Sequence, residues 1–189
     1  MDAERWRCFV AVPIGEALRA SLDASLESSR ERADLADLRW TDSDGWHVTL
    51  AFLGPVEPDS VPGLIERLTS ISAESGTSVR TGGLGAFPTP ARARVAWYGV
   101  EDADGRLAGL ASDVARALSL RVTQPFRAHV TLARARQRPV DLRSWLASAS
   151  APEGVLGVDR IALMRSHIGG GPARYETVAT IPLGVRAGV

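Results

Sequence analysis

The sequence is short of several residue types, and each shortage narrows what the chain can do. It contains no lysine, so all 22 of its basic residues are arginine, and its only cysteine is Cys8. A single cysteine excludes an internal disulfide, and the apolar run around Cys8 predicts a buried small side chain rather than a nucleophile. No stretch is long and apolar enough to cross a bilayer. We therefore expect a protein with neither membrane spans nor disulfides.

Net charge is absent as well. The 22 arginines are balanced by 22 acidic residues, and the sequence pI is about 6.8. This balance excludes a protein that coats nucleic acid through its overall charge, so any recognition of phosphate must be local. The N-terminus has no basic region leading into an apolar segment, and we therefore expect a cytoplasmic location.

Histidine is scarce, with 3 in 189 residues, and two of the three begin the same tetrapeptide, His-Val-Thr-Leu. In an extended strand, the histidine and threonine of each copy share one face while the valine and leucine share the other. One such motif alone is typical of a structural pair, but its duplication favours a shared cleft for acid–base chemistry on an oxyanion. The predicted catalytic residues are His47, Thr49, His129 and Thr131.

The elements around the two motifs recur in the same order. In each half a buried strand precedes an amphipathic helix, the motif strand, a second helix and a further strand. The halves cover about 5–86 and 94–166, with the motifs 82 residues apart, and a last strand follows at 174–183. No linker separates them. The pattern predicts one α+β domain over 1–189, made of two lobes related by internal duplication.

Periodicity and turn residues give the expected bounds of these elements. Asp59 or Ser60, and later Asp141, are expected to cap helices. The predicted helices are 15–32, 61–68, 107–118 and 142–146, and the predicted strands are 5–14, 47–53, 77–86, 95–100, 129–132, 156–166 and 174–183.

These features resemble the two-histidine phosphoesterase superfamily, and within it the LigT-like RNA 2′,3′-cyclic phosphodiesterases, also described as 2′-5′ RNA ligases. The paired His-x-Thr carries the resemblance, which runs almost end to end. Ala128 departs from the pattern, because many members have proline before the second motif. The other matching segments are 7–13, 39–40, 47–54, 85–88, 94–97, 126–134 and 165–166.

The resemblance implies a bilobal, pseudo-symmetric α+β fold in which antiparallel sheets line a central cleft and helices lie outside. It implies hydrolysis of a 2′,3′-cyclic phosphodiester to a 2′-phosphate, with no metal and no cofactor. By analogy, His47 gives a proton to the leaving oxygen and His129 activates water, while the pseudo-symmetry of the two motifs leaves the reverse order open. The implied substrates are RNA 3′ ends or small nucleotides carrying the cyclic phosphate. A monomer without an obligatory protein partner or membrane is expected.

Arg134 is the predicted contact to the substrate phosphate. It follows His129 by five residues, so strand alternation turns it away from the imidazole unless the strand bulges near Ala133. The family nevertheless places an arginine against the phosphate at this point. The segment 121–143 has six arginines against one aspartate. This excess suits an RNA backbone, although such a run is also typical of a solvated face.

Aromatic residues near the motifs are candidates for stacking a terminal base, with core packing as the alternative for each. They are Trp46, Phe52, Phe126 and Tyr175, of which Phe126 is preferred. His167 is expected in a loop at the cleft rim, without a catalytic role.

Three other functions stay open. A metal hydrolase needs three or four clustered ligands, and the sequence has no His-x-His, no His-Glu-x-x-His and no cysteine pair. A non-catalytic nucleotide-binding module would not need two opposed titratable groups. An enzyme for 2′-5′ linkages or another small cyclic nucleotide would use the same motifs, because loops select the leaving group.

Overall fold

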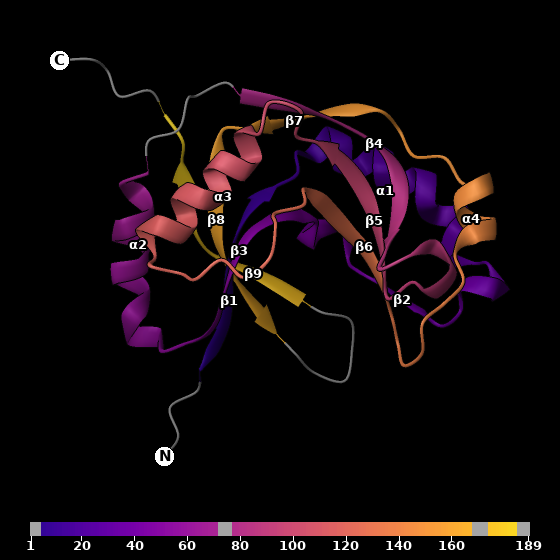
Figure 1. Ribbon diagram of the computed structural model, residues 1–189, viewed down its shortest axis with the longest axis horizontal. Coiled ribbons are helices and arrows are strands. Elements are labelled where there is room, and N and C mark those ends of the chain that lie inside the picture. Colours follow the sequence, from indigo (N-terminus) through magenta and orange to yellow (C-terminus); the bar gives the residue numbers. More distant parts are fainter. Residues whose placement is uncertain (1–4, 72–76, 168–173, 185–189) are drawn as a thin grey trace.

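The computed structural model describes residues 5–71, 77–167 and 174–184, and its nine strands form one antiparallel sheet (Figure 1). Along the sheet the strands follow the order β7-β4-β5-β6-β3-β1-β8-β9, with β2 beside β6. The strands are β1 (Trp6–Pro13), β2 (Leu38–Trp40), β3 (His47–Val56), β4 (Thr77–Phe87), β5 (Val95–Glu101), β6 (His129–Ala135), β7 (Gly154–Val158), β8 (Arg160–His167) and β9 (Arg174–Pro182). The helices are α1 (Glu16–Arg30), α2 (Val61–Thr69), α3 (Arg106–Ala117) and α4 (Arg143–Ser148).

The sheet consists of two four-stranded halves that meet at the motif strands. One half is β9-β8-β1-β3 and the other is β6-β5-β4-β7. Strands β3 and β6 are joined by one residue pair, Val48 with Val130. The expected antiparallel sheets are therefore continuous with each other through this pair.

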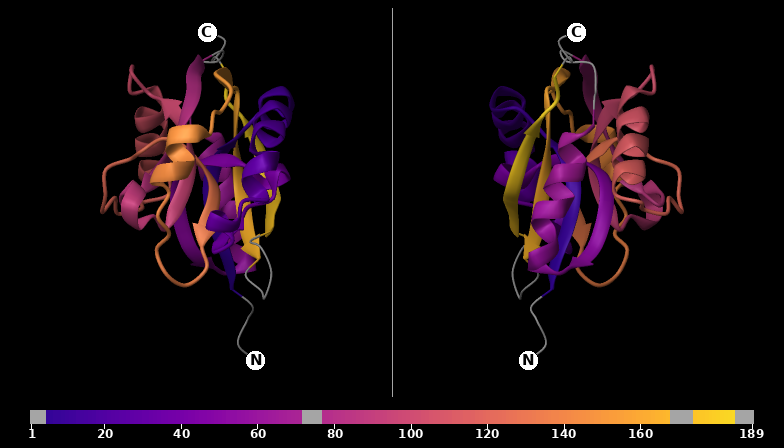
Figure 2. Two further views of the ribbon diagram at one scale, coloured as in Figure 1. Left: turned by 90° about the vertical axis from the view of Figure 1, so that its right-hand side faces the viewer. Right: turned by 90° about the vertical axis from the view of Figure 1, so that its left-hand side faces the viewer.

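Helices cover the outer side of each half. Each of the two long helices, α1 and α3, follows a strand of one half but packs against a strand of the other half. Helix α3 follows β5 but packs on β3, and α1 follows β1 but contacts β7. Figure 1 shows α2 and α3 beside β8, with α1 and α4 at the opposite end. Figure 2 shows α1 and α3 on opposite sides of the molecule. These crossings tie the two halves into one packed body.

A large apolar cluster lies between the helices and the sheet, and its members follow the predicted periodicities. In α3 the helical stripe is buried, from Leu107 through Val114, while in β1 Cys8, Val10 and Val12 point to the same cluster. A second, smaller cluster lies on the other face of β1 and β8, and it consists of Phe9, Ala11, Ala162 and Met164. This second face carries the motif histidines.

The structure differs from the predicted elements at a few points. The single strand expected at 156–166 is two strands, because the chain passes at Asp159 from one half of the sheet to the other. Strand β2 was not predicted, since three residues carry no periodicity. Ser60 does occupy the N-cap of α2, but its side chain makes no capping hydrogen bond. His167 closes strand β8 rather than lying in a loop, and residues 168–173 lie outside the described residues.

Among the residues that the structure describes, no helix has both the length and the apolar character needed to span a membrane.

Candidate active site

The register between β3 and β6 brings the two motifs together. Val48 pairs with Val130 in an antiparallel bridge, and both side chains are fully buried. Continuing this register by one residue in either direction sets His47 beside Thr131, and it sets Thr49 beside His129. Because alternate side chains point to opposite faces, all four polar side chains lie on the face opposite the two valines.

Both motif strands contain a bulge at the leucine of the motif. In β3, Val10 pairs with Ala51 and Ala11 with Thr49, which leaves Leu50 as the extra residue. In β6 the corresponding pairs lie on either side of Leu132. An extra residue resets the alternation of side chains. The bulge near Ala133 that Arg134 requires is therefore present, and it returns Arg134 to the face of the imidazoles.

Phe52 occupies the position in the first half that Arg134 occupies in the second. Each residue follows the threonine of its motif by three residues, and each motif strand has a bulge at the same place. Phe52 packs beside Phe9, with ring centroids 6.1 Å apart, and is 71% exposed. The two halves thus share a backbone design but present an aromatic ring at one position and a guanidinium at the other.

Two aromatic rings enclose His47. The ring of Phe9 lies 4.7 Å away and that of Tyr175 lies 5.0 Å away, edge-on to the imidazole. Tyr175 also covers Gly45, where a Cβ atom would lie 2.7 Å from the tyrosine ring. The Nδ1 atom of His47 donates to the Gly45 carbonyl oxygen at 2.5 Å. The neutral ring therefore carries its proton on Nδ1 and leaves the Nε2 lone pair free.

His129 is held in the same way. Its Nδ1 atom donates to the carbonyl oxygen of Arg127 at 2.7 Å, which again leaves Nε2 free. The ring of Phe87 stands edge-on at 5.1 Å. Phe87 also packs against Trp97, which pairs with Thr131 and lies flat over Gly85, where a Cβ atom would come within 2.1 Å of the indole.

Burial keeps both imidazoles neutral. It lowers the pKa of His47 to about 4, against the opposing effect of the hydrogen bond to Gly45, and the positive charge of Arg134, with that of His129 when its ring is protonated, lowers it further. Burial also lowers the pKa of His129, again with a contribution from Arg134. Arg134 is therefore within electrostatic reach of both rings. Two neutral imidazoles beside an arginine form a site that favours an anion.

Arg39 lies directly opposite Arg134 in the pairing of β2 with β6. Like charges at directly opposite positions of neighbouring strands repel each other. Sequence reasoning placed Arg39 only as a family match, because a three-residue strand gives no sign of its partner.

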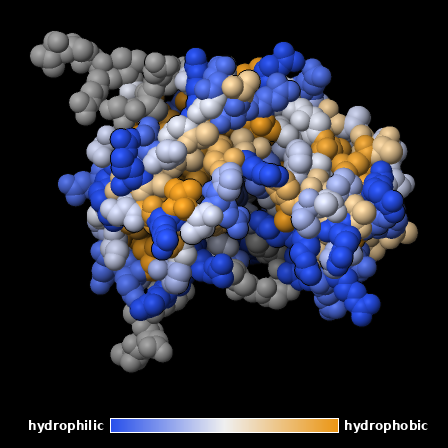
Figure 3. All heavy atoms as spheres, viewed as in Figure 1, coloured by the Kyte–Doolittle hydropathy of each residue, from blue (hydrophilic) through white to orange (hydrophobic). Residues whose placement is uncertain are grey.

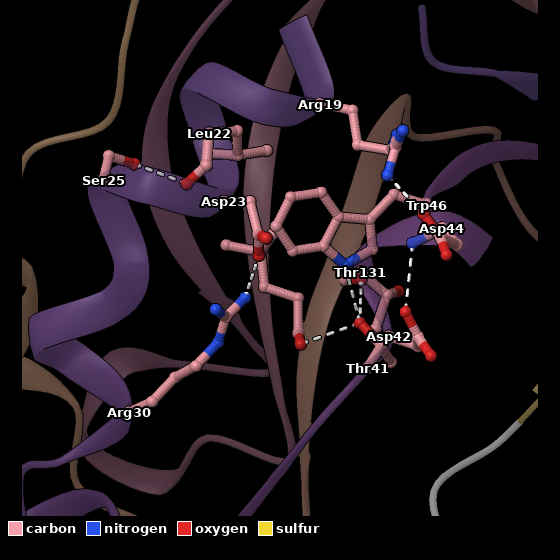
Figure 4. A network of polar contacts seen from close by, with 11 residues as sticks. Arg19, Leu22, Asp23, Ser25, Arg30, Thr41, Asp42, Asp44, Trp46 and Thr131 are labelled. Carbon is pink, nitrogen blue, oxygen red and sulfur yellow. Dashed lines mark hydrogen bonds and ion pairs between the residues drawn. The ribbon is translucent and has the colours of Figure 1, made fainter. Parts of the chain in front are cut away.

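A hydrogen-bonded strap joins the two motif strands (Figure 4). The Thr41 hydroxyl lies 3.0 Å from the Thr131 carbonyl oxygen and 2.8 Å from that of Leu132, and the Thr41 amide donates to the latter at 2.8 Å. The indole Nε1 of Trp46 donates to the same hydroxyl at 2.9 Å. Since Trp46 immediately precedes His47, this strap links the start of one motif strand to the bulge of the other.

Two of the residues predicted to stack a base, Trp46 and Phe126, pack against the core. Trp46 is buried, so it does not offer a face for stacking. Phe126 packs partly against the main core. Phe9 and Phe87 contact the histidines, although they were not among the residues predicted from sequence. Their place on predicted strands near the motifs was the signal that could have identified them. His167 is exposed and bonds to Glu176 at 2.8 Å. Among the described residues, no three His, Cys, Asp or Glu side chains cluster as metal ligands would.

Comparisons with known proteins give a consistent result. A family model described as LigT like Phosphoesterase matches residues 12–97. An RNA 2′,3′-cyclic phosphodiesterase of Geobacillus stearothermophilus is 33% identical over 95% of this chain, which spans 58% of that protein's length. One from Archaeoglobus fulgidus is 30% identical over 70% of this chain and 74% of its own. The crystal structure of E. coli LigT complexed with 3′-AMP shares the fold, with a TM-score of 0.72 and 23% identity over 95% of this chain and 99% of that chain.

The pKa of His47 leads to a prediction about stability. The unfolded chain takes up a proton near pH 6.5, whereas folded His47 does so only at about pH 4. As the pH falls from 6.5 to 4, this difference should lower the free energy of unfolding by about 3 kcal/mol. His47→Asn keeps a donor toward Gly45 and removes the titration. Urea unfolding at several pH values should show the wild type losing that much stability relative to His47→Asn, and parallel curves would contradict the lowered pKa.

A second prediction concerns the strap. Thr41→Val removes the hydroxyl and leaves buried polar atoms unpaired, so it should lower the free energy of unfolding by about 1–3 kcal/mol. Thr41→Ser should restore most of the loss. Thr69→Val is the matched control, because that exposed hydroxyl bonds only within its own helix. Equal effects of the valine substitutions at 41 and 69 would show that the strap contributes nothing.

Proposed function

Because the chain belongs to the LigT-like phosphoesterase family, we propose that it hydrolyses a 2′,3′-cyclic phosphodiester at the end of RNA or on a nucleotide. The observation that carries this proposal is the register of Val48 with Val130, which sets two matched His-x-Thr pairs on one face. Curated relatives are named RNA 2′,3′-cyclic phosphodiesterases, and they extend over most of this chain.

The reaction needs a base for water and an acid for the leaving oxygen. In the proposed mechanism the Nε2 atom of His129 accepts a proton from water as the water oxygen attacks phosphorus. The bond from phosphorus to the ribose O3′ breaks, and His47 donates its Nε2 proton to that oxygen. The products are a terminal 2′-phosphate and a free 3′-hydroxyl, and one proton has passed from His47 while another has passed to His129.

The lowered pKa of His47 bears on this assignment. With a pKa of about 4, His47 is neutral in the free protein at neutral pH, whereas the proposed acid must hold a proton. The negative charge of a bound phosphodiester raises the pKa of both rings. Binding of the substrate therefore favours the charged form of His47 that the proposed acid requires.

In the proposed mechanism, Thr49, Thr131 and Arg134 stabilise the negative charge on the phosphate. Thr49 and Thr131 are half-buried hydroxyl donors on strands, and strands hold donors in place better than loops do. Arg134 supplies a fixed positive charge. No carboxylate is assigned to the reaction, and no metal is needed, because each charge that develops has a donor from the chain itself.

A base attached to the cyclic phosphate needs an apolar surface. Phe126 was the preferred candidate from sequence, but it packs partly against the core. Phe52 offers a ring that is 71% exposed on the same face as His47. We therefore assign base stacking to Phe52, with Phe126 as the alternative on the side of His129.

The central prediction is that both histidines are required. His47→Ala and His129→Ala should each lower kcat for a nucleoside 2′,3′-cyclic monophosphate by about 100-fold or more, the usual contribution of a general acid or base. His167→Ala is the control, since that exposed histidine lies outside the mechanism. Circular dichroism should show all three variants folded at neutral pH. Full activity in either motif variant would remove that residue from the mechanism.

The products and the role of metal can be tested in one assay. Turnover in excess EDTA should equal turnover without it, and phosphorus NMR should show the 2′-phosphate as the product. Loss of activity in EDTA that Mg²⁺ or Zn²⁺ restores would contradict the metal-free mechanism. A 3′-phosphate as the only product would contradict the assignment of the leaving oxygen.

A further inference from the structure

The two motif histidines make the same hydrogen bond, but the residues that accept it differ. Each ring donates from Nδ1 to the carbonyl oxygen two residues before it, which belongs to Gly45 for His47 and to Arg127 for His129. Gly45 is buried at the end of the 3-10 helix Ser43–Gly45, whereas Arg127 is exposed and lies outside the helices and strands. The fold therefore encloses the residue that orients His47 and leaves its counterpart open.

Tyr175 is the side chain that packs on Gly45. A Cβ atom at position 45 would lie 2.7 Å from Cδ2 of the tyrosine and 3.6 Å from its Cβ and Cγ atoms. Gly45 is not among the glycines with a positive φ, so its backbone conformation is open to other residues. Glycine is required at position 45 because the tyrosine ring approaches the backbone so closely.

Tyr175 reaches Gly45 from the edge of the sheet. It lies on β9, where it pairs with Ser166 of β8, and strands β8 and β1 separate β9 from the motif strand β3. Its ring is perpendicular to that of Phe9 on β1 at 5.4 Å and to that of His47 at 5.0 Å. Strand β7 forms the corresponding edge of the other half, and its sequence Gly-Val-Leu-Gly-Val contains no aromatic residue. This contact therefore makes the two halves of the site unequal.

From these contacts we propose that Tyr175 is a positioning residue for His47. The inference rests on the proposed function and deepens it, because Tyr175 acts through His47 rather than on the reacting atoms. Phe9 and Tyr175 pack against the imidazole while Gly45 accepts its Nδ1 proton, so the ring cannot turn without displacing one of these contacts. Such contacts hold Nε2 in place, and a small displacement of a reacting group slows a reaction strongly.

This role differs from base stacking, for which Tyr175 was a candidate from sequence. A stacking residue affects only substrates that carry a base, whereas a residue that positions His47 affects every substrate of the site. The contacts of Tyr175 with Phe9, Gly45 and His47 all involve carbon atoms of its side chain. Phenylalanine at position 175 should therefore preserve the positioning role.

The charges that act on His47 come from the second half. They belong to Arg134 and His129 of β6, and Figure 3 shows hydrophilic residues gathered at the lower right, over the end of β6 and the loop after it. Asp44, next to the glycine, is exposed and paired with an arginine of α1. Replacing Tyr175 by a small residue therefore exposes the imidazole without changing these charges. Exposure favours the protonated ring and should raise the pKa of His47 toward its ordinary value.

The test compares Tyr175→Ala, which removes the ring, with Tyr175→Phe, which keeps it. Thr177→Ala is the control on the same strand, because Thr177 is exposed. Each protein is assayed with a nucleoside 2′,3′-cyclic monophosphate and with the 2′,3′-cyclic phosphate of methyl riboside, which has no base. NMR of the ring nitrogens measures the pKa of each histidine in the free proteins.

Tyr175→Ala should lower kcat by about tenfold to 100-fold with both substrates. It should also raise the pKa of His47 from about 4 toward the ordinary value, while the pKa of His129 stays as in the wild type. Tyr175→Phe and Thr177→Ala should match the wild type in turnover and in both pKa values.

A second variant tests the same contact from the backbone and leaves the tyrosine in place. Gly45→Ala puts a methyl group against the ring, so it should lower kcat in the wild type. In the Tyr175→Ala background the methyl group has room, and the same substitution should have little effect. Additive losses from the two substitutions would show that Tyr175 does not act through Gly45, and this would overturn the proposal.

Two other results would also overturn it. An increase in KM alone, limited to the substrate with a base, would assign Tyr175 to base stacking instead. An unchanged pKa of His47 in Tyr175→Ala would show that the ring does not enclose the imidazole. Absence of wild-type turnover with both substrates would contradict the proposed function, and the NMR titration would still decide whether Tyr175 encloses His47.

Discussion

The pairing of Val48 with Val130 is the constraint on which the rest of the site depends. It is the one described pair that joins β3 to β6, and both side chains are fully buried between the sheet and its helices. A shift of one residue would turn the histidines into the core and the valines to the opposite face of the sheet. The apolar half of each motif therefore determines where its polar half acts. The Thr41 strap secures the same alignment through hydrogen bonds beside the bulge of β6.

The duplicated motif explains how much could be predicted from sequence. Alternation in His-Val-Thr-Leu predicts both the buried valines and the displayed histidines, and the helical stripes predict α1 and α3 closely. These features depend on local periodicity. The crossing of the chain at Asp159 does not depend on local periodicity, because it is determined by which half of the sheet each strand joins. A single predicted strand therefore became β7 and β8.

The parts of the site that sequence reasoning missed depend on tertiary contacts. Arg134 lies on the face of the imidazoles because of a bulge in β6, and this bulge is visible only in the register of β5 with β6. Trp46 appeared available for stacking, but its indole is buried as a donor to Thr41. Phe9 and Phe87 appeared to be ordinary strand residues. They contact the imidazoles because the folded sheet brings neighbouring strands beside each motif.

Electrostatics connect the fold to the proposed chemistry. Burial lowers the pKa of two imidazoles near an arginine. Strands β4 and β6 contain no carboxylate, and Glu101 at the end of β5 pairs with Arg80 instead. In the proposed function, the substrate phosphate supplies the negative charge that this site favours. It would gain from the positive charge of Arg134, and it would raise the pKa of both rings so that one of them can hold a proton. In the proposed mechanism, binding of the phosphate therefore favours formation of the acid.

The most direct test of the central claim is a histidine NMR titration with and without a nucleoside 2′-phosphate. If one phosphate lies between the two imidazoles, one equivalent of ligand should shift the ring nitrogen signals of His47 and His129 together and raise the pKa of both, while His167 serves as the reference. A response from only one of the two histidines, or from neither, would contradict a shared phosphate site.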